Sequence, residues 1–489
     1  MTGVQGQGLE PVIGLEVHAQ LLTRSKMFCG CSATYSGTPP NTHVCAVCSG
    51  MPGALPVINR AAVDMAVLAA LALNCRIAEQ SKFDRKNYSY PDLPKGYQIS
   101  QYDMPIGIEG RLNFDLAGET RSCRLVRVHL EEDTGKLIHA AESGREYSLV
   151  DYNRSGVPLI EIVSEPDLRS PEEARRFFVE LRRILMFIGV NDGNLQEGSL
   201  RADVNVSVRR PDGSFGTKVE IKNLNSFRSV QRALEYEIDR QRAVLGRGEL
   251  LEQETRGWLE DEEVTVSQRT KEHAHDYRYF PEPDLPPLLL TGERVSALRE
   301  SLAELPADRE KRFIAEYGLR PQTASLLTDD RLLADYFEEA VSAAGPVDPS
   351  RVANWVTGDV LRVLHEIDAA PGGPQLPARS VGAIVSLVER GTISGAAGKT
   401  VLETVAATHE SPDEVVRRLN LAQLVDPRAL EELAESVLRE NPRLVQAFAK
   451  NPRVLEALVG KAISASGSKA SPALLRSIME ERLQRADVR

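Results

Sequence analysis

Residues 201–210 read Arg-Ala-Asp-Val-Asn-Val-Ser-Val-Arg-Arg, and polar and apolar side chains alternate along nearly the whole stretch. Successive side chains of a β-strand point to opposite faces of its sheet, so this alternation predicts a strand with one apolar and one polar face. The polar face would carry Arg201, Asp203, Asn205, Ser207 and Arg209. An ordinary solvated face explains one such strand, because antiparallel sheets commonly keep one side in water.

The same alternation recurs at residues 13–20, 125–133 and 218–222. Their polar positions hold Glu16, His18, Gln20, Arg127, His129, Glu131, Asp133, Lys218, Glu220 and Lys222. Short acids, histidine, asparagine and arginine are typical of sites that bind a metal and a phosphate, whereas solvated faces are usually filled by Thr, Lys, Glu and Gln. The sequence therefore predicts one sheet whose polar face is an active site.

The length of the chain predicts more than one domain. Its 489 residues exceed the roughly 250–300 over which one hydrophobic core usually grows, so two or three domains are expected. No apolar run approaches the roughly 18 residues of a membrane span, and residues 1–10 lack the basic and apolar regions of a signal peptide. We therefore expect a soluble, cytoplasmic protein without membrane contact.

Charge is distributed unevenly along the chain. The net charge of −11 argues against indiscriminate binding to nucleic acid. Residues 441–489 nevertheless carry nine Lys or Arg against four Asp or Glu. A basic tail on an acidic body favours one localised contact with a polyanion, although an ordinary charged helical surface has the same composition.

The sequence pattern changes near residue 293. Before it, short alternating runs are separated by Gly- and Pro-rich turns and interrupted by helical stretches, which predicts an α+β domain over residues 1–293. After it, Leu and Ala recur at helical spacing with few β-branched runs. This predicts an all-α domain over residues 294–410 and a small helical tail domain over residues 411–489.

Four cysteines lie close together in the sequence, at Cys29, Cys31, Cys45 and Cys48. In a reducing compartment, a C-x-C pair followed by a C-x-x-C pair favours tetrahedral zinc over disulfides, with unliganded loop thiols as the alternative. Four cysteines close the coordination sphere, which predicts a structural Zn²⁺ that holds the loop over residues 29–48.

Residues 395–400, Gly-Ala-Ala-Gly-Lys-Thr, have the appearance of the end of a phosphate-binding loop. The G-x-x-x-x-G-K-T spacing would require glycine at the position that Ile393 occupies. No apolar strand leads into the segment either. We therefore expect a turn between helices here, and we place any ATP site elsewhere.

Several longer motifs resemble those of the B subunits of aspartyl/glutamyl-tRNA amidotransferases. They stand at residues 13–18, 82–101, 129–136, 151–161, 197–203, 220–227 and 276–284. Among them are His-Leu-Glu-Glu-Asp-Thr-Gly-Lys at 129–136 and Asp-Tyr-Arg-Tyr-Phe-Pro-Glu-Pro-Asp at 276–284. The resemblance extends from about residue 10 to the C-terminus, and the motifs are long enough to be specific.

The resemblance implies both a fold and a reaction. Members of this family have an antiparallel catalytic sheet similar to that of glutamine synthetase, followed by a helical domain and a small tail domain that contacts tRNA. They use ATP and Mg²⁺ to phosphorylate the side-chain carboxylate of Glu or Asp misattached to tRNA(Gln) or tRNA(Asn), and ammonia then displaces the phosphate. The ammonia comes from glutamine hydrolysed by a separate amidase (A) subunit. A small bridging (C) subunit makes the assembly a heterotrimer.

The polar face and the resemblance together define the candidate site residues. Phosphoryl transfer to a carboxylate needs Mg²⁺ held by acids and cations around the transferring group. The candidates for Mg²⁺ are Glu16, His18 and Glu131, and the catalytic candidates are Glu131, Glu132, Arg201, Asp203 and Lys222. Strand alternation favours Glu131 over Glu132 for the polar face. Glu197 and Asp203 are also candidates for binding a second metal or lining the ammonia path. Arg154, Lys271 and Arg278 are candidates for binding phosphate.

Two other functions fit parts of the sequence. An amide ligase acting on free glutamate would use the same acid-lined sheet, but the basic tail and the long helical region argue against it. A non-catalytic, zinc-stapled RNA-binding scaffold would need a sheet face dominated by Lys and Arg with exposed aromatic rings. The acids Glu16, Glu131 and Asp203 argue against that scaffold.

Overall fold

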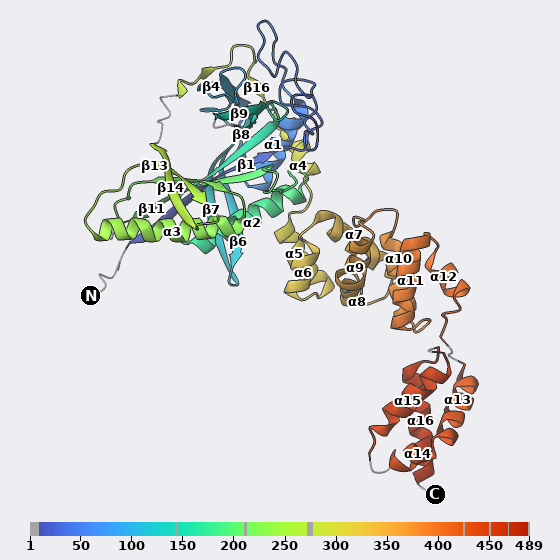
Figure 1. Ribbon diagram of the computed structural model, residues 1–489. Helices are drawn as coiled ribbons and strands as arrows, with labels where there is room; N and C mark the ends of the chain where they lie inside the picture. Colours follow the sequence, from blue (N-terminus) through green and yellow to red (C-terminus); the bar gives the residue numbers. More distant parts are fainter. Residues whose placement is uncertain are drawn as a thin grey trace. The chain divides into compact units, whose positions relative to one another are not determined.

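The computed structural model describes residues 9–142, 145–209, 213–270, 277–423, 426–448, 451–467 and 469–487. The chain divides into two compact units, Met1–Leu305 and Pro306–Arg489 (Figure 1). The first unit is built on a large, mainly antiparallel sheet with helices, and the described part of the second unit is helical. The predicted mixed class, with a large antiparallel sheet followed by helices, is therefore confirmed. The boundaries proposed at residues 293 and 410 stay predictions.

The main sheet has nine strands among the described residues, in the order β14-β13-β12-β11-β1-β10-β7-β6-β2. Its central strands are β11 (Leu200–Arg209), β1 (Glu10–Gln20), β10 (Pro158–Ser164) and β7 (Glu119–Glu132). Outside them lie β12 (Val219–Leu224), β13 (Glu254–Leu259), β14 (Val264–Thr270), β6 (Gly107–Leu116) and β2 (Arg76–Ile77). The alternating stretches of the sequence become β11, β1, β7 and β12, and they share this one sheet as predicted.

The apolar face of the main sheet packs against helices. These are α1 (Arg60–Ala72), α2 (Pro171–Phe187) and α3 (Phe227–Gly246). Leu15 of β1, Val204 of β11 and Leu130 of β7 are almost fully buried in the same core as Phe178 of α2. Each such side chain contributes about 1.5–3 kcal/mol through burial. The period-two pattern therefore leaves the other face of the same strands free for polar groups.

Smaller sheets complete the first unit. A three-stranded sheet has the order β15-β4-β5 and consists of β15 (Phe280–Pro281), β4 (Asp84–Asn87) and β5 (Tyr97–Ser100). Two-stranded sheets are formed by β8 (Lys136–Glu142) with β9 (Arg145–Asp151) and by β3 (Gln80–Ser81) with β16 (Leu288–Leu289). Helix α4 (Gly292–Ser301) packs on α1, where Arg294 Nη2 donates to Asp64 Oδ1 at 2.6 Å.

The second unit begins with α5 (Pro306–Tyr317), α6 (Pro321–Leu327), α7 (Arg331–Ala344), α8 (Pro349–Trp355), a π-helical turn (Val356–Val360), α9 (Leu361–Glu366), α10 (Ala378–Glu389), α11 (Gly395–Thr408) and α12 (Pro412–Arg418). It ends with α13 (Pro427–Glu440), α14 (Pro442–Phe448), α15 (Val454–Ala465) and α16 (Pro472–Asp487). Leu430, Leu458 and Met479 belong to a separate hydrophobic core within these last helices. No helix in the described ranges is long and apolar enough to cross a membrane.

The prediction of an interhelical turn at residues 395–400 is wrong. The segment forms the first turns of α11, because the Ser394 side chain accepts a hydrogen bond from Ala397 N and caps the helix there. Gly398 serves helix packing, since a Cβ at this position would lie 2.9 Å from Trp355 Cη2 and 2.7 Å from Val388 Cγ2. The helix α10, and no strand, precedes the segment, as predicted.

We predict that Leu130→Ala lowers the free energy of unfolding of the first unit by about 2–5 kcal/mol, because it leaves a cavity in the core. Val126→Ala is the matched control, since Val126 lies on the same strand but is 37% exposed whereas Leu130 is fully buried. Denaturant unfolding can be followed by the fluorescence of Trp258 in a Trp355→Phe background, because these are the two tryptophans of the chain. Equal losses for the two variants would contradict the assignment of the core.

Candidate active site

The register between neighbouring strands determines which side chains meet on the polar face of the main sheet. His18 of β1 lies opposite Arg201 of β11 on one side and opposite Glu161 of β10 on the other. Glu161 in turn lies opposite His129 of β7. Directly opposed residues in antiparallel strands point to the same face, so four adjacent strands bring a row of charged and ionisable side chains together.

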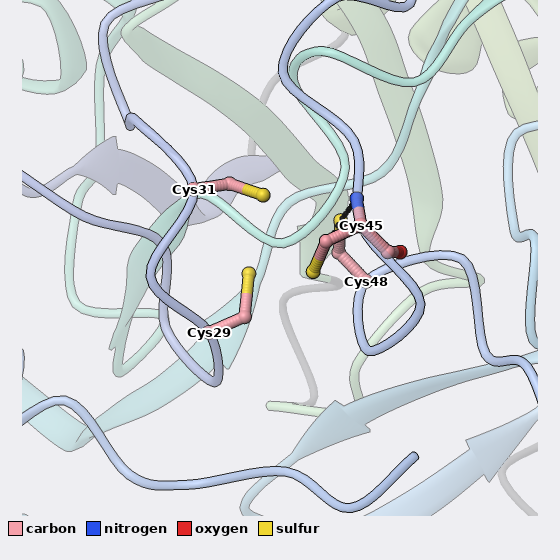
Figure 2. A group of neighbouring side chains, drawn as sticks. All are labelled: Cys29, Cys31, Cys45 and Cys48. Atoms are coloured by element: carbon pink, nitrogen blue, oxygen red, sulfur yellow. Dashed lines mark hydrogen bonds between the residues drawn. The ribbon is translucent and has the colours of Figure 1, made fainter.

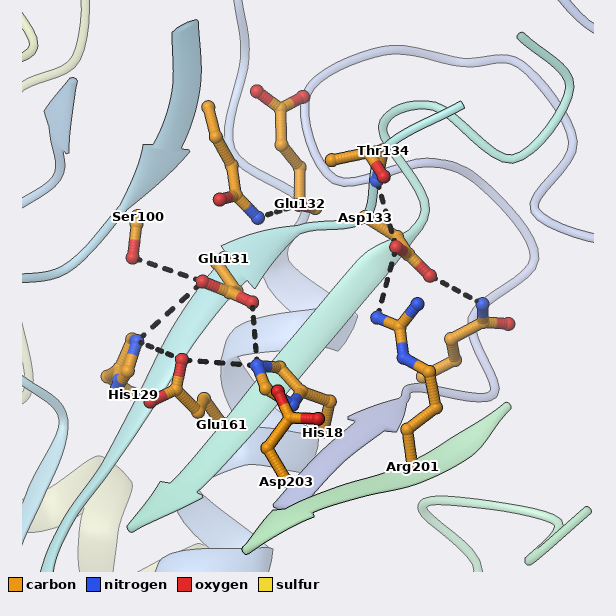
Figure 3. A network of polar contacts seen from close by, with 12 residues as sticks. His18, Ser100, His129, Glu131, Glu132, Asp133, Thr134, Glu161, Arg201 and Asp203 are labelled. Atoms are coloured by element: carbon orange, nitrogen blue, oxygen red, sulfur yellow. Dashed lines mark hydrogen bonds and ion pairs between the residues drawn. The ribbon is translucent and has the colours of Figure 1, made fainter. Parts of the chain in front are cut away.

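His18, Glu131 and Glu161 form a compact cluster on this face (Figure 3). His18 Nε2 lies 3.3 Å from Glu161 Oε2 and 3.8 Å from Glu131 Oε1. His129 Nε2 lies 3.6 Å from the same Glu161 oxygen, and Ser100 Oγ donates to Glu131 Oε2 at 3.3 Å. One donor atom from each of the three residues lies within 4.8 Å of the others. Two carboxylates and an imidazole so placed fit a divalent cation that keeps several waters, as Mg²⁺ does.

The charges of this cluster shift its pKa values. Burial alone would raise the pKa of Glu161, but His129, His18 and Lys86 hold it well below its usual range. The pKa of Glu131 is also lowered, because a hydrogen bond from His129 and the charges of His18 and Lys86 outweigh burial. Burial would lower the pKa of His18, yet Glu161 and Glu131 raise it. Both carboxylates are therefore ionised, and a bound metal would compete with the His18 proton.

A second group of charges lies further along β1, around Glu16. Asn205 Nδ2 donates to Glu16 Oε1 at 2.8 Å. Lys222 Nζ lies 2.5 Å from Asp203 Oδ2 and 3.4 Å from Glu220 Oε1. Although burial opposes it, the three acids raise the pKa of Lys222. The lysine therefore remains cationic beside the acids.

Asp133 forms ion pairs with two arginines of the polar face, Arg201 and Arg154. Arg201 Nη2 donates to Asp133 Oδ1 at 3.2 Å, and Arg154 Nε lies 3.8 Å from Asp133 Oδ2. Arg154 also donates to the backbone oxygens of Thr134 at 2.9 Å and Gly135 at 2.7 Å. Arg154 therefore fixes the chain after β7, and Arg201 is the arginine that borders the open part of the face.

The charged side chains line a hollow in the protein surface. This hollow, of about 310 Å³, is bordered by Glu16, His18, Lys86, Arg127, His129, Glu131, Glu161, Asp203, Glu220, Lys222, Ser100, Gln101, Tyr102, Thr255, Tyr277 and Tyr279. An adjoining hollow of about 320 Å³ shares His18, Lys86, Glu131, Asp203 and Lys222 with it and adds Arg201 and Asp133. Acids able to hold a metal and cations able to hold a phosphate thus surround one space.

The four clustered cysteines form a second candidate metal centre (Figure 2). All are free, and their sulfur atoms lie within 4.8 Å of one another, with Cys45 Sγ and Cys48 Sγ 3.8 Å apart. Zn–S bonds of about 2.3 Å separate the sulfurs of a tetrahedral site by about 3.8 Å. Hydrogen bonds from Cys29 and from the backbone of Cys45, with the charge of Lys26, lower the pKa of Cys48 to about 4, although burial opposes them. The cluster therefore fits one zinc ion.

Comparison with known proteins identifies the family. Residues 11–296 match the family model described as "GatB/GatE catalytic domain", and residues 335–483 match the one described as "GatB domain". The chain belongs to the GatB family. The resemblance drawn from the motifs is thereby confirmed.

Relatives of this GatB chain match it over nearly their whole length. It is 54% identical to the B subunit of the aspartyl/glutamyl-tRNA(Asn/Gln) amidotransferase from Thermomicrobium roseum, over 97% of the chain and 99% of the relative. It is 50% identical to the protein of the same name from Moorella thermoacetica, again over 97% and 99%. The identity is 49% to that of a Roseiflexus species, over 97% of the chain and 98% of the relative.

The structure of this GatB chain brings most of the predicted site residues together. Glu16, His18, Glu131, Arg201, Asp203 and Lys222 all line the two hollows. Figure 3 shows Glu131 directed toward His18, whereas Glu132 points away, as alternation predicts. Glu132 instead forms an ion pair with Lys95. Glu197 and Arg278 are exposed and line neither hollow, and Lys271 lies outside the described residues.

Two charged residues of the candidate site were not singled out from the sequence. Glu161 is the one acid of the otherwise mainly apolar run at residues 158–164, and a buried acid in a central strand is a signal that could have identified it. Lys86 gives no such signal, because it comes from β4, outside the main sheet. Its Nζ lies 5.0 Å from the centre of the Tyr277 ring, and Glu131 raises its pKa against the effect of burial.

We predict that Glu161→Gln lowers the pKa of His18 in metal-free protein, because the substitution removes the carboxylate 3.3 Å from its Nε2. The measurement is a ¹³C NMR titration of labelled histidine after chelator treatment, with the His18 signal assigned by His18→Gln. Glu119→Gln, at the exposed start of β7, is the control and should leave this pKa unchanged. An unchanged His18 pKa in Glu161→Gln would contradict the electrostatic picture.

Proposed function

We propose that this GatB-family chain is the B subunit of a tRNA-dependent amidotransferase that serves protein biosynthesis. In this proposal it activates the side-chain carboxylate of Glu or Asp on misacylated tRNA(Gln) or tRNA(Asn) by ATP-dependent phosphorylation, and ammonia then forms the amide. The observation that carries the proposal is the ionised pair Glu131 and Glu161 beside His18, with the cations Lys86 and Lys222 around the same hollow. Its relatives, which are named as B subunits of amidotransferases, support the choice.

The residues of the hollow supply charge and position, and no protein nucleophile is needed. The substrate carboxylate itself attacks the γ-phosphorus of ATP, and the bond to ADP breaks. Glu131, Glu161 and His18 would hold Mg²⁺, with Glu16 beside them, and bound Mg²⁺ neutralises charge on the phosphates. Lys222 and Arg201 offer cations to the phosphate oxygens from the neighbouring strands. Phosphate then leaves as ammonia attacks the activated carbonyl carbon.

Other residues hold these groups in position. Asp203 fixes Lys222 through its 2.5 Å ion pair. Glu132, paired with Lys95, acts by fixing the end of β7. Arg154 holds the backbone that follows. In the loop over residues 29–48, the four cysteines would hold a structural Zn²⁺.

The proposal includes partners that this chain needs. We infer that ammonia comes from an amidase (A) subunit, with a small bridging (C) subunit, in a cytoplasmic heterotrimer, because the sequence carries no amidase motif of its own. The basic residues 441–489 support a contact between the tail and tRNA. The main sheet is expected to resemble that of glutamine synthetase, whose reaction also activates a carboxylate with ATP.

We place the base of ATP in a further hollow, which Glu16 also borders. It has a volume of about 310 Å³ and lies against Gly14, Val206 and Phe215. Gly14 has no side chain to project into the hollow, and Phe215, which borders it, is 68% exposed. A base there could stack on the aromatic ring, with its phosphates directed past Glu16 toward Lys222.

We predict that Glu131→Gln reduces amide formation by roughly two to three orders of magnitude, because it weakens the metal site. Assays of the complete enzyme should measure ADP release and amide formed with Glu-tRNA, free glutamate and uncharged tRNA. The partner's glutaminase activity and the affinity for tRNA should stay near the level of the unchanged enzyme. Glu119→Gln serves as the control. Loss of tRNA affinity would mean that the site is misplaced, and turnover on free glutamate alone would favour an amide ligase.

We also predict that Phe215→Ala weakens the binding of Mg-ATP by about ten-fold, because base stacking is lost. Binding of Mg-tripolyphosphate, which has no base, should not change. Calorimetry on the full chain measures both, and Tyr147→Ala provides a control that removes a partly exposed aromatic ring of the β8–β9 hairpin. An equal loss for both ligands would exclude the base from this hollow.

A further inference from the structure

Lys26 has no exposed surface, although it carries an ammonium group. Its Nζ donates to the backbone oxygens of His43 at 2.7 Å and Tyr152 at 3.2 Å. Its third contact is to Cys48 Sγ at 3.7 Å. These three acceptors match the three N–H bonds of the ammonium group.

A buried ammonium group is costly unless an anion compensates it. Two of its acceptors are neutral carbonyl oxygens, so Cys48 is the partner that can carry negative charge. Glu132 borders the same pocket, but its side chain is paired with Lys95. The charge of Lys26 is therefore directed at the cysteine cluster.

We propose that Lys26 is the counter-ion of the four-cysteine metal centre and a positioning residue for Cys48. This inference rests on the zinc ion of the proposed function, and not on the amidotransfer reaction. Four thiolates around Zn²⁺ have a net charge of −2, which one lysine reduces to −1. By favouring the thiolate of Cys48, Lys26 helps to retain the metal, as groups around metal ligands commonly do.

The same lysine joins the metal loop to the chain beside the candidate active site. It donates to Tyr152 O, next to which His43 N donates to Asn153 Oδ1 at 2.8 Å. Asn41 N likewise donates to Asp151 Oδ1 at 2.9 Å. Arg154, which follows Asn153 in the sequence, donates hydrogen bonds to the backbone after β7. The metal loop is thus fastened to the segment that fixes the end of this strand.

The first test measures zinc in purified full-length protein that has not met a chelator. The unchanged chain should contain one zinc ion, and Lys26→Met should transfer it to a chelating dye about ten-fold faster or more. Lys26→Gln keeps a donor for the two carbonyl oxygens but removes the charge, so it should resemble Lys26→Met. Lys26→Arg should restore slow release. Lys95→Met is the matched control, because Lys95 borders the same pocket but pairs with Glu132, and its zinc should leave at the unchanged rate.

The second test separates charge from packing. In a Cys48→His background, the ligand next to Lys26 is neutral, so adding Lys26→Met should change zinc release less than two-fold. In a Cys31→His background, Cys48 is still a thiolate and the roughly ten-fold effect should persist. Cobalt-substituted protein reports the ligand set through its visible absorption, and circular dichroism reports folding.

Unchanged zinc release in folded Lys26→Met and Lys26→Gln would overturn the inference, and so would the same acceleration in both histidine backgrounds. A chain that contains no zinc would also overturn it. That result would leave the proposed amidotransfer untouched, because amide formation is measured separately from zinc content. Absence of amide formation by the complete enzyme, with zinc release accelerated in Lys26→Met as expected, would instead count against the proposed function alone.

Discussion

The antiparallel pairing of β1 between β11 and β10 is the constraint on which the rest of the first unit depends. It sets His18 opposite Arg201 and Glu161 in one step, and it buries Leu15 and Val17 on the reverse face. A shift of one residue in this register would exchange the two faces, so the hydrophobic core and the charged hollow are specified together. Burial of the apolar face therefore stabilises the geometry of the polar one.

The polar face stays folded because its charges compensate one another. Buried carboxylates such as Glu131 and Glu161 would be costly alone. They are balanced by histidines and by Lys86, just as Asp133 is balanced by Arg201. This network leaves room for a metal or a phosphate in the middle, because the charged groups lie around the hollow and do not fill it.

The sequence predicted those features that depend on local periodicity. Alternation identified four strands of the main sheet, β1, β7, β11 and β12, and it separated Glu131 from Glu132 because the two faces differ at every second residue. It could not identify Lys86, whose strand belongs to a different sheet and meets the hollow only through tertiary packing. Glu161 was missed because the residues around it are mainly apolar. Polar and apolar positions do not alternate there, so the pattern does not show which face Glu161 occupies. The turn expected at residues 395–400 became helix because Ser394 caps it.

The small sheet that carries Lys86 has a consequence for the order of folding. Arg85 of β4 forms two hydrogen bonds of 2.7 Å with Glu282, which lies 197 residues later in the sequence. Strand β4 also pairs with β15, at residues 280 and 281. During synthesis the lysine's strand can therefore pair only with β5 until this late segment has left the ribosome. The charge balance of the hollow is completed near the end of the first unit, so an unfinished chain does not present a finished nucleotide site.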